Sequence, residues 1–98
     1  AAVGAAFVSV VLNHRGQLVA DPDVVLEGIP ETDAEGNEMV DIALDAVDGT
    51  LRSIPEKRRR DPDVVEDAVS RAVRAAFDQA WGKKPLVRCI VTQVDAKA

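Results

Sequence analysis

Apolar residues are most regularly spaced in the second half of the chain, across residues 61–94. Large apolar side chains recur at every fourth position from Val65 to Trp81, and a row of smaller ones runs beside them. This spacing predicts one long amphipathic helix with a wide apolar face. Asp61 suits the cap at its start and Gly82 the cap at its end, and the run 86–94 predicts a strand.

Residues 3–12 predict another strand, with apolar side chains on both of its faces. Alternate residues fall into two sets, Ala6, Val8, Val10 and Leu12 on one side and Val3, Ala5, Phe7 and Val11 on the other. A strand of this kind is normally central in its sheet and covered on both sides. Residues 13–16 signal a turn, and residues 17–20 begin a return strand. Residues 21–23 interrupt it and residues 24–26 resume it, which favours an edge strand with a bulge or kink.

A second amphipathic helix is predicted to start near Asn37 or Glu38 and to end at Pro55. Its apolar seam consists of Val40, Leu44, Val47, Leu51 and Ile54. Gly49 in its interior costs about 1 kcal/mol relative to alanine, so this helix is the weaker of the two. Residues 55–60 form a short connection, and short connections place helices as antiparallel neighbours.

The predicted order of elements is strand, strand, helix, helix, strand, or ββααβ. If the first strand runs up, the alternating directions make the last strand parallel to the first. Placing the last strand beside the two-sided first strand gives the sheet order 2-1-3. The sequence therefore predicts an α+β two-layer sandwich, in which a three-stranded mixed sheet carries two antiparallel helices on one face.

This arrangement leaves the other face of the sheet without cover. We expect apolar residues of the first and last strands to lie there, and a contiguous apolar patch usually marks a protein interface. The candidate interface residues are Val3, Ala5, Phe7, Val11, Val87, Cys89 and Val91. The alternative is that the strand phase is different and that only small residues are exposed on this face.

Composition places the chain among globular proteins, as a single domain over residues 1–98. It is 47% hydrophobic and 30% charged, and no apolar run approaches the length of a membrane span, so no membrane partner is expected. The single Cys89 excludes an internal disulfide framework, which favours the cytoplasm. The chain has no initiator Met and begins inside a predicted strand, which suggests a piece cut from a longer protein.

The search for catalytic and metal-binding residues gives a negative prediction. One His and one Cys cannot build a multi-His metal site, and His14 lies in a turn, where a solvated residue is the usual case. For Cys89, in an apolar strand, a buried inert thiol is expected. The acids Asp41, Asp45 and Asp48 follow helical spacing on a polar face. We predict no catalytic residue, no metal site and no cofactor in this domain.

The two halves of the chain carry opposite charge. Residues 1–50 have one basic and ten acidic residues, a net charge of −9, and residues 51–98 have eleven and seven, a net charge of +4. Two basic groups are candidate contacts for RNA phosphates, namely Lys57, Arg58, Arg59 and Arg60, and Lys83 and Lys84. The total charge of −5 and the lack of a stacking platform for bases oppose this interpretation.

Two stretches of the sequence resemble a known family. They are residues 8–29, VSVVLNHRGQLVADPDVVLEGI, and residues 72–94, AVRAAFDQAWGKKPLVRCIVTQV. Both are similar to the C-terminal domain of bacterial ribonuclease J, an enzyme of the metallo-β-lactamase/β-CASP family. The resemblance covers nearly the whole chain and rests on features of fold and turn. It implies a three-stranded sheet under two helices, and a zinc centre in a separate β-lactamase domain, whose HxHxDH-type motif has no match here.

The resemblance also implies a cytoplasmic parent enzyme, a zinc-dependent hydrolase of RNA degradation and processing, with catalysis outside this chain. In the family, this domain is associated with oligomerisation and full activity. We therefore expect a non-catalytic domain whose partners are a second copy in a homodimer, the catalytic domains of the parent, and RNA through the parent. The alternatives are a small ligand-binding regulatory module, and an RNA-guiding domain that uses basic residues 57–60 and 83–84.

Overall fold

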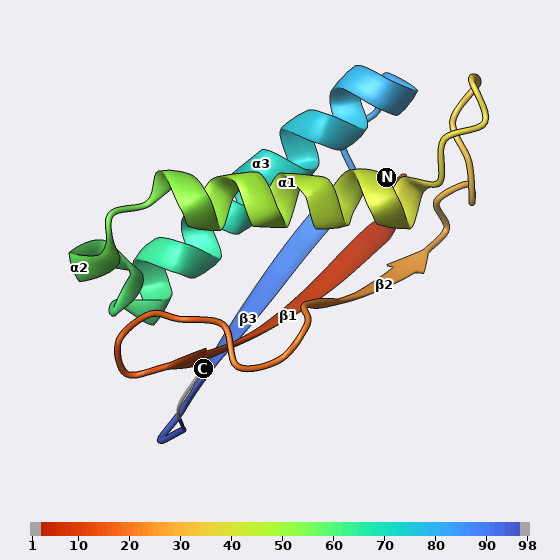
Figure 1. The fold of residues 1–98 in the computed structure, drawn as a ribbon. Coiled ribbons are helices and arrows are strands. Elements are labelled where there is room, and N and C mark those ends of the chain that lie inside the picture. The colour runs from red at the N-terminus through yellow and green to blue at the C-terminus, as the bar shows by residue number, and fades with distance from the viewer. Residues whose placement is uncertain (1–2, 97–98) are drawn as a thin grey trace.

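The computed structural model describes residues 3–96, which form one three-stranded sheet below a layer of helices. Figure 1 shows the elements in the order of the chain. They are β1 (Ala5–Asn13), β2 (Asp23–Glu27), α1 (Met39–Ser53), α2 (Glu56–Arg59), α3 (Pro62–Trp81) and β3 (Leu86–Val94). Both long helices lie on the same side of the sheet, so the predicted α+β two-layer architecture is confirmed.

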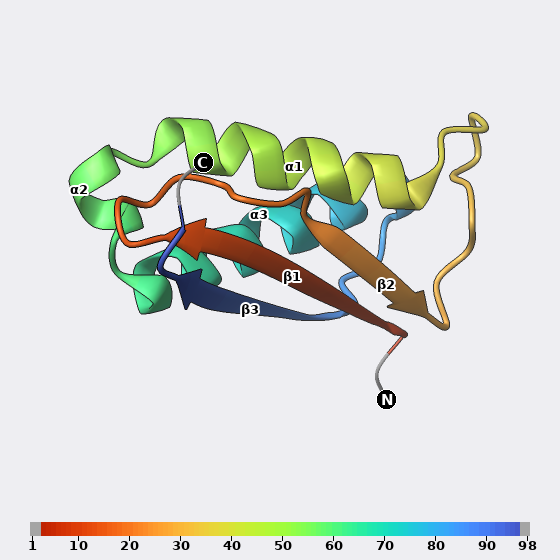
Figure 2. The ribbon, with the colours of Figure 1, turned by 60° about the horizontal axis from the view of Figure 1, so that its bottom comes forward.

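The strand order is β2-β1-β3, as the alternating chain directions predict. β1 is the central strand, parallel to β3 and antiparallel to β2 (Figure 2). Ala5, at the start of β1, pairs with Glu27 on one side and with Leu86 on the other. Residues that pair across neighbouring strands point to the same face of a sheet, so this register decides which side chains meet the helices.

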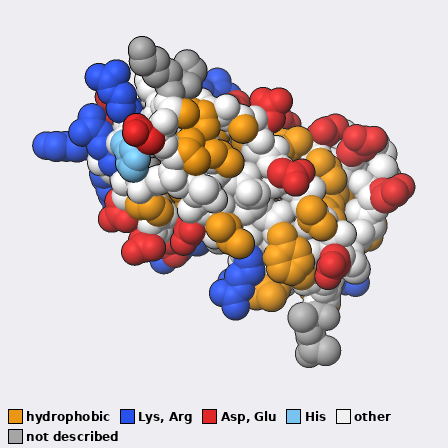
Figure 3. Space-filling model, turned by 90° about the horizontal axis from the view of Figure 1, so that it is seen from below, with side chains coloured by type: hydrophobic (Ala, Val, Ile, Leu, Met, Phe, Trp, Pro, Cys, Tyr) orange, Lys and Arg blue, Asp and Glu red, His pale blue; other side chains and the backbone are white. Residues whose placement is uncertain are grey.

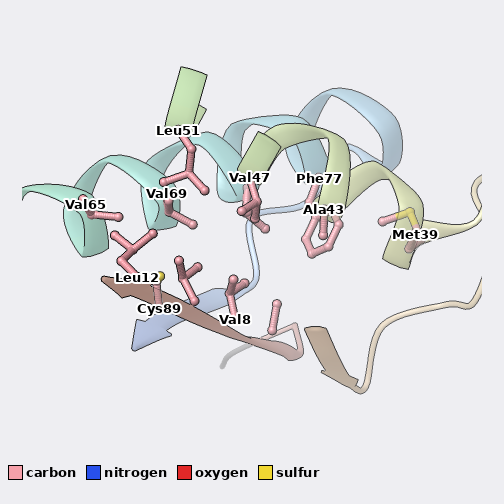
Figure 4. Close-up of a cluster of buried hydrophobic side chains, with 13 residues drawn as sticks. Val8, Leu12, Met39, Ala43, Val47, Leu51, Val65, Val69, Phe77 and Cys89 are labelled. Carbon is pink, nitrogen blue, oxygen red and sulfur yellow. The ribbon is translucent and has the colours of Figure 1, made fainter. Parts of the chain in front are cut away.

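The hydrophobic core fills the space between the sheet and the two long helices (Figure 4). β1 contributes alternate residues, whereas α1 and α3 contribute residues four positions apart, as the geometry of strands and helices requires. The buried apolar residues are Ala6, Val8, Val10, Leu12, Met39, Ala43, Val47, Leu51, Val65, Val69, Val73, Phe77 and Cys89. Phe77 is the largest fully buried side chain among them.

Helix α3 forms where the sequence predicts it. The Asp61 carboxylate accepts a hydrogen bond from the Asp63 backbone N–H at 3.0 Å, and Pro62 occupies the first helical position. Gly82 ends the helix with a φ of 76°, in the left-handed region that glycine enters without steric cost. The buried row consists of Val65, Val69, Val73 and Phe77, which confirms the predicted apolar face.

The buried row of α1 differs from the predicted seam. Met39, Ala43, Val47 and Leu51 are buried, so only the second half of the prediction is correct. Val40 is exposed and Leu44 is half-buried. Rows three and four residues apart lie on one broad helix face, and tertiary contacts select between them. Here α1 contacts both α3 and β2, and the row that points between these elements is the buried one.

The return strand starts later than the sequence predicts. Residues 17–20 make a single bridge, from Leu18 to Leu12, and regular pairing begins only where Asp23 meets Ser9. Leu18 and Asp23 are five residues apart, whereas their partners on β1, Leu12 and Ser9, are three residues apart. The extra residues on the return side form a bulge. The intervening proline cannot donate a ladder hydrogen bond. The predicted edge position and the predicted interruption are confirmed, and residues 17–20 contribute one bridge instead of a length of strand.

The connection at residues 55–60 contains the extra helix α2, which the sequence analysis did not predict. The backbone N–H groups of Arg58 and Arg59 donate to the Pro55 carbonyl at 2.9 and 3.0 Å and close one turn. Proline is favoured at the start of a helix, because its missing N–H would have no partner there. This turn holds four consecutive basic residues at one end of the molecule.

Candidate assembly surface

The sheet face opposite the helices carries several exposed apolar side chains. Phe7 is central, with Val25 of β2 as its register partner, and Leu86 and Ile90 of β3 lie diagonally across from it. Their exposed fractions are 40% for Phe7, 50% for Val25, 47% for Leu86 and 63% for Ile90. Figure 3 shows this face from the side opposite the helices, with apolar patches interrupted by single charged side chains. We call Phe7, Val25, Leu86 and Ile90 the open-face cluster.

The structure places the predicted interface residues of the first strand on or beside this face. Phe7 is exposed, and Ala5 and Val11 are half-buried members of the same alternating set. Val3 is exposed and precedes β1, at the end of the sheet where Ala5 and Leu86 also line a shallow hollow. The β1 phase is therefore correct.

The predicted interface residues of the last strand have the opposite phase, and their placement on the open face is wrong. The register pairs Val87 with Ala6 and Cys89 with Val8, and both partners belong to the core. Cys89 is only 8% exposed, and Val87 and Val91 pack against the core. A shift of one residue moves every side chain of a strand to the other face, so one wrong phase misplaces all three.

Val25, Leu86 and Ile90 were not among the interface residues predicted from the sequence. β3 has apolar residues at both even and odd positions, so hydrophobicity alone leaves its phase undecided. Its polar residues carry the missing signal, because Arg88 and Thr92 share the even positions with Leu86 and Ile90. A charged residue faces solvent unless it is paired, so the even positions should have been assigned to the open face.

Cys89 has the chemistry of a buried thiol. Burial raises its pKa from 9.0 to about 12, and the negative charge of Glu66 adds to this shift. A thiol reacts as a nucleophile or metal ligand only when it is ionised. At neutral pH Cys89 is therefore protonated and unreactive, as its position in an apolar strand predicts.

The outer edge of β3 is partly blocked by side chains. The backbone N–H of Val91 donates to a carboxylate oxygen of Glu66, on α3, at 2.9 Å. At the end of the strand, the Gln93 amide donates to the Arg60 carbonyl at 2.9 Å. A backbone N–H that already donates to a side chain is not available to pair with another strand. The open face is therefore a better assembly surface than this edge.

The two predicted basic groups lie at opposite ends of the molecule. Residues 57–60 lie on and just after α2, whereas Lys83 and Lys84 follow the other end of α3, beside the start of β1 (Figure 2). Lys83 lies over the Trp81 ring, 5.1 Å from its centroid. Arg59 points inward and donates to the Leu51 carbonyl at 3.1 Å. The six residues therefore do not form one surface.

The hollows on this molecule do not favour the small-ligand alternative. The space between helices and sheet is filled by the core. A surface groove of about 370 Å³ lies between α3 and the start of β3, and its lining includes Asp67, Arg71, Arg74 and Lys84. The Asp67 and Arg71 side chains are 62% and 80% exposed and pair with each other at 3.3 Å. Ligand sites normally combine apolar enclosure with a few buried polar groups, and this groove lacks the enclosure.

The part of the chain that the structure describes shows neither a metal-binding cluster nor a membrane-spanning helix. Within residues 3–96, no three His, Cys, Asp or Glu side chains lie together in a way that could hold a metal ion. No helix in that part of the chain is both long enough and apolar enough to cross a membrane.

Comparison with known proteins finds similar sequences. A family model, described as the ribonuclease J C-terminal domain, matches residues 1–94. A curated ribonuclease J from Sinorhizobium meliloti is 49% identical over 87 residues. The match covers 89% of the chain and 15% of that protein, so the chain spans only a small part of the relative's length.

Proposed function

The chain belongs to the ribonuclease J C-terminal domain family, and we propose on this premise that it is the non-catalytic assembly domain of an RNA-degrading and RNA-processing enzyme. Its role is to hold two catalytic units together and so to support their full activity. Zinc-dependent hydrolysis belongs to separate catalytic domains of the parent, which are further partners of this domain. We place the parent in the cytoplasm, where it meets RNA.

The observation that carries this proposal is the open-face cluster. Its four large side chains come from all three strands, and each is at least 40% exposed. The two long helices cover only the other side of the sheet. Large exposed apolar patches are costly in water and usually mark protein interfaces. Burying them against a partner recovers about 25 cal/mol for each Å² of apolar area.

A second copy is the partner that the charges of this face favour. Arg88 lies on β3 in register with Phe7, whereas Asp23 and Glu27 lie on β2, all on the open face. Two stacked sheets related by a two-fold axis parallel to the strands bring β3 of one copy opposite β2 of the other. Arg88 then meets the partner's acidic residues at the rim of the apolar contact, and opposite charges fix such a register.

The size of the face predicts a reversible dimer. Three strands about 4.8 Å apart and up to about 30 Å long present roughly 400 Å² for each copy. Stable interfaces bury about 800 Å² for each partner, and association has a large entropic cost. We therefore expect the chain to dimerise in the micromolar range, and linked catalytic domains to add contacts of their own.

Sedimentation velocity at increasing protein concentration tests this proposal. The wild type should change from monomer to dimer, and Ile90→Glu should remain monomeric, because a carboxylate would be buried without a partner. Val40→Glu is the matched control, since it makes the same change at an exposed apolar residue on α1. A wild type that stays monomeric at high micromolar concentration, or a folded Ile90→Glu that dimerises normally, would contradict the proposal.

A further inference from the structure

One end of the molecule gathers basic side chains from two distant parts of the sequence. Helix α2 supplies Lys57 and Arg58 and is followed by Arg60, and the turn after β1 supplies His14 and Arg15. Figure 3 shows Lys and Arg side chains beside the histidine at one end of the open face, with a few acids among them. Lys57, Arg58 and Arg60 were predicted as RNA contacts from the sequence, whereas His14 and Arg15 were not, because the sequence does not show that the turn lies beside α2.

Asn13 organises the turn after β1 through its side chain. The buried Asn13 side chain accepts hydrogen bonds from the backbone N–H groups of Arg15 and Gln17 at 2.9 and 3.0 Å. Its amide donates to the Gln17 side chain at 2.9 Å. This network leaves His14 and Arg15 exposed at the tip.

Direct packing joins this turn to α2. Gly16 has a φ of 78°, and a Cβ atom there would lie 2.6 Å from the Cβ atom of Arg59, so only glycine fits. Arg59 is held from the other side by its hydrogen bond to the Leu51 carbonyl. Arg59 therefore joins the two segments, and its neighbours on α2 point outward.

Three of the cations at this end are free to bind an anion. Among the ion pairs within residues 3–96, Arg60 pairs with Glu56 at 3.6 Å and Arg52 pairs with Asp48, whereas Arg15, Lys57 and Arg58 have no acidic partner. All three side chains are exposed. We call Arg15, Lys57 and Arg58 the basic end.

We propose that the basic end contacts the phosphate backbone of RNA. The choice of RNA rests on the proposed function, and the choice of phosphate rests on chemistry. Arginine forks and lysine ammonium groups are the usual partners of phosphate oxygens. Neither Phe7 nor Trp81 belongs to the basic end, so neither of these rings can stack on a base there. Contacts of this kind position a strand without reading its sequence.

The arrangement also separates the basic end from the open-face cluster. His14 and Arg15 follow the last residue of β1, whereas Phe7 and Val25 pair in its first half. Both surfaces can therefore be used in the same dimer. Two basic ends in one dimer would double the number of phosphate contacts available to a long RNA, which raises apparent affinity through effective concentration.

Fluorescence anisotropy with a labelled single-stranded RNA of mixed sequence tests the inference on the 98-residue chain. Three phosphate contacts predict that log K falls with log salt with a slope of about −2, or roughly 20-fold weaker binding between 50 and 200 mM salt. Lys57→Glu/Arg58→Glu should weaken binding at least about tenfold at low salt and flatten the slope. Arg15→Glu should weaken binding about threefold or more, although it is 42 residues away in sequence.

Matched controls separate a local site from total charge. Lys83→Glu/Lys84→Glu makes the same change in net charge at the opposite end and should alter binding less than about twofold. An equal effect of both double variants, no effect of Arg15→Glu, or no RNA binding at 50 mM salt would overturn the inference. Equal competition by polyglutamate at matched charge would also overturn it, in favour of an acidic protein partner. Running the same titration on Ile90→Glu separates this result from failure of the assembly proposal.

Discussion

The two faces of the sheet are built from the same strands and differ in what covers them. On the helix side, Val8 and Val10 of β1 are at most 2% exposed, whereas Phe7, which directly precedes Val8 in the same strand, is 40% exposed on the other side. Hydrophobicity of the strand therefore does not decide burial here. The number of helices decides it, because two helices cover one side of three strands. The covered face stabilises the domain, and the open face is left for a partner.

The largest expected effect is on the free energy of unfolding, and it distinguishes Phe77 from Phe7. Phe77→Ala should lower the free energy of unfolding by about 3–5 kcal/mol, because the ring is fully buried and its removal leaves a cavity. Phe7→Ala should cost less than about 1 kcal/mol in the monomer, since much of that ring already contacts water. Denaturation in urea at low protein concentration measures both.

Arg74→Ala is the control for this pair, since Arg74 is exposed on α3 and should change stability by less than about 0.5 kcal/mol. A Phe7 variant that is destabilised as much as the Phe77 variant would show that the open face is covered within the monomer.

The next largest effect is at high pH and tests which way Cys89 points. Its folded-state pKa of about 12 lies above the value of 9.0 for an unperturbed thiol. Below pH 9 both states keep the proton, and above it the unfolded state ionises first. Stability should therefore fall between pH 9 and 12, by at most about 4 kcal/mol.

Comparison with Cys89→Ala isolates this effect, and the absence of tyrosine removes one other group that titrates in this range. Parallel stability profiles for wild type and Cys89→Ala above pH 9 would mean that the thiol is solvated, as it would be on the open face.

The smallest effect concerns the charges at the rim of the open face. Arg88→Glu should weaken dimerisation by about 1 kcal/mol, or roughly fivefold in the dissociation constant, because a rim charge contributes little. Adding Asp23→Arg should restore part of the loss, since the exchanged charges again face each other across the two-fold axis. Failure of the double variant to recover any affinity would reject this orientation and leave the face itself to be tested separately.

The sequence predicted most of the fold, but of the open-face cluster it predicted only Phe7. Capping by Asp61 and Gly82 and the regular valine spacing defined α3, because these signals are local. The phase of β3 was harder, since both of its faces carry apolar residues and the register is set by β1 rather than by β3 itself. Arg88 indicates the correct phase of β3, because an unpaired charged side chain faces solvent.

The basic end shows a second limit of sequence analysis. Arg15 and Lys57 are brought together by packing of Gly16 against Arg59, a contact between residues 43 positions apart. The local sequence pattern of neither segment predicts that contact. The placement of Lys83 and Lys84 at the opposite end likewise follows from the length and direction of α3 in the assembled fold.

The measurement that tests the assembly surface most directly is the labelling rate of a single thiol on the open face. Ser9→Cys in a Cys89→Ala background places that thiol beside Ile90 with little change in shape. Its reaction with a maleimide should slow as protein concentration rises through the dimerisation range, whereas Ser53→Cys, exposed at the end of α1, should react at a constant rate. A Ser9→Cys rate that stays constant while sedimentation shows dimers forming would contradict the assignment of this face as the assembly surface.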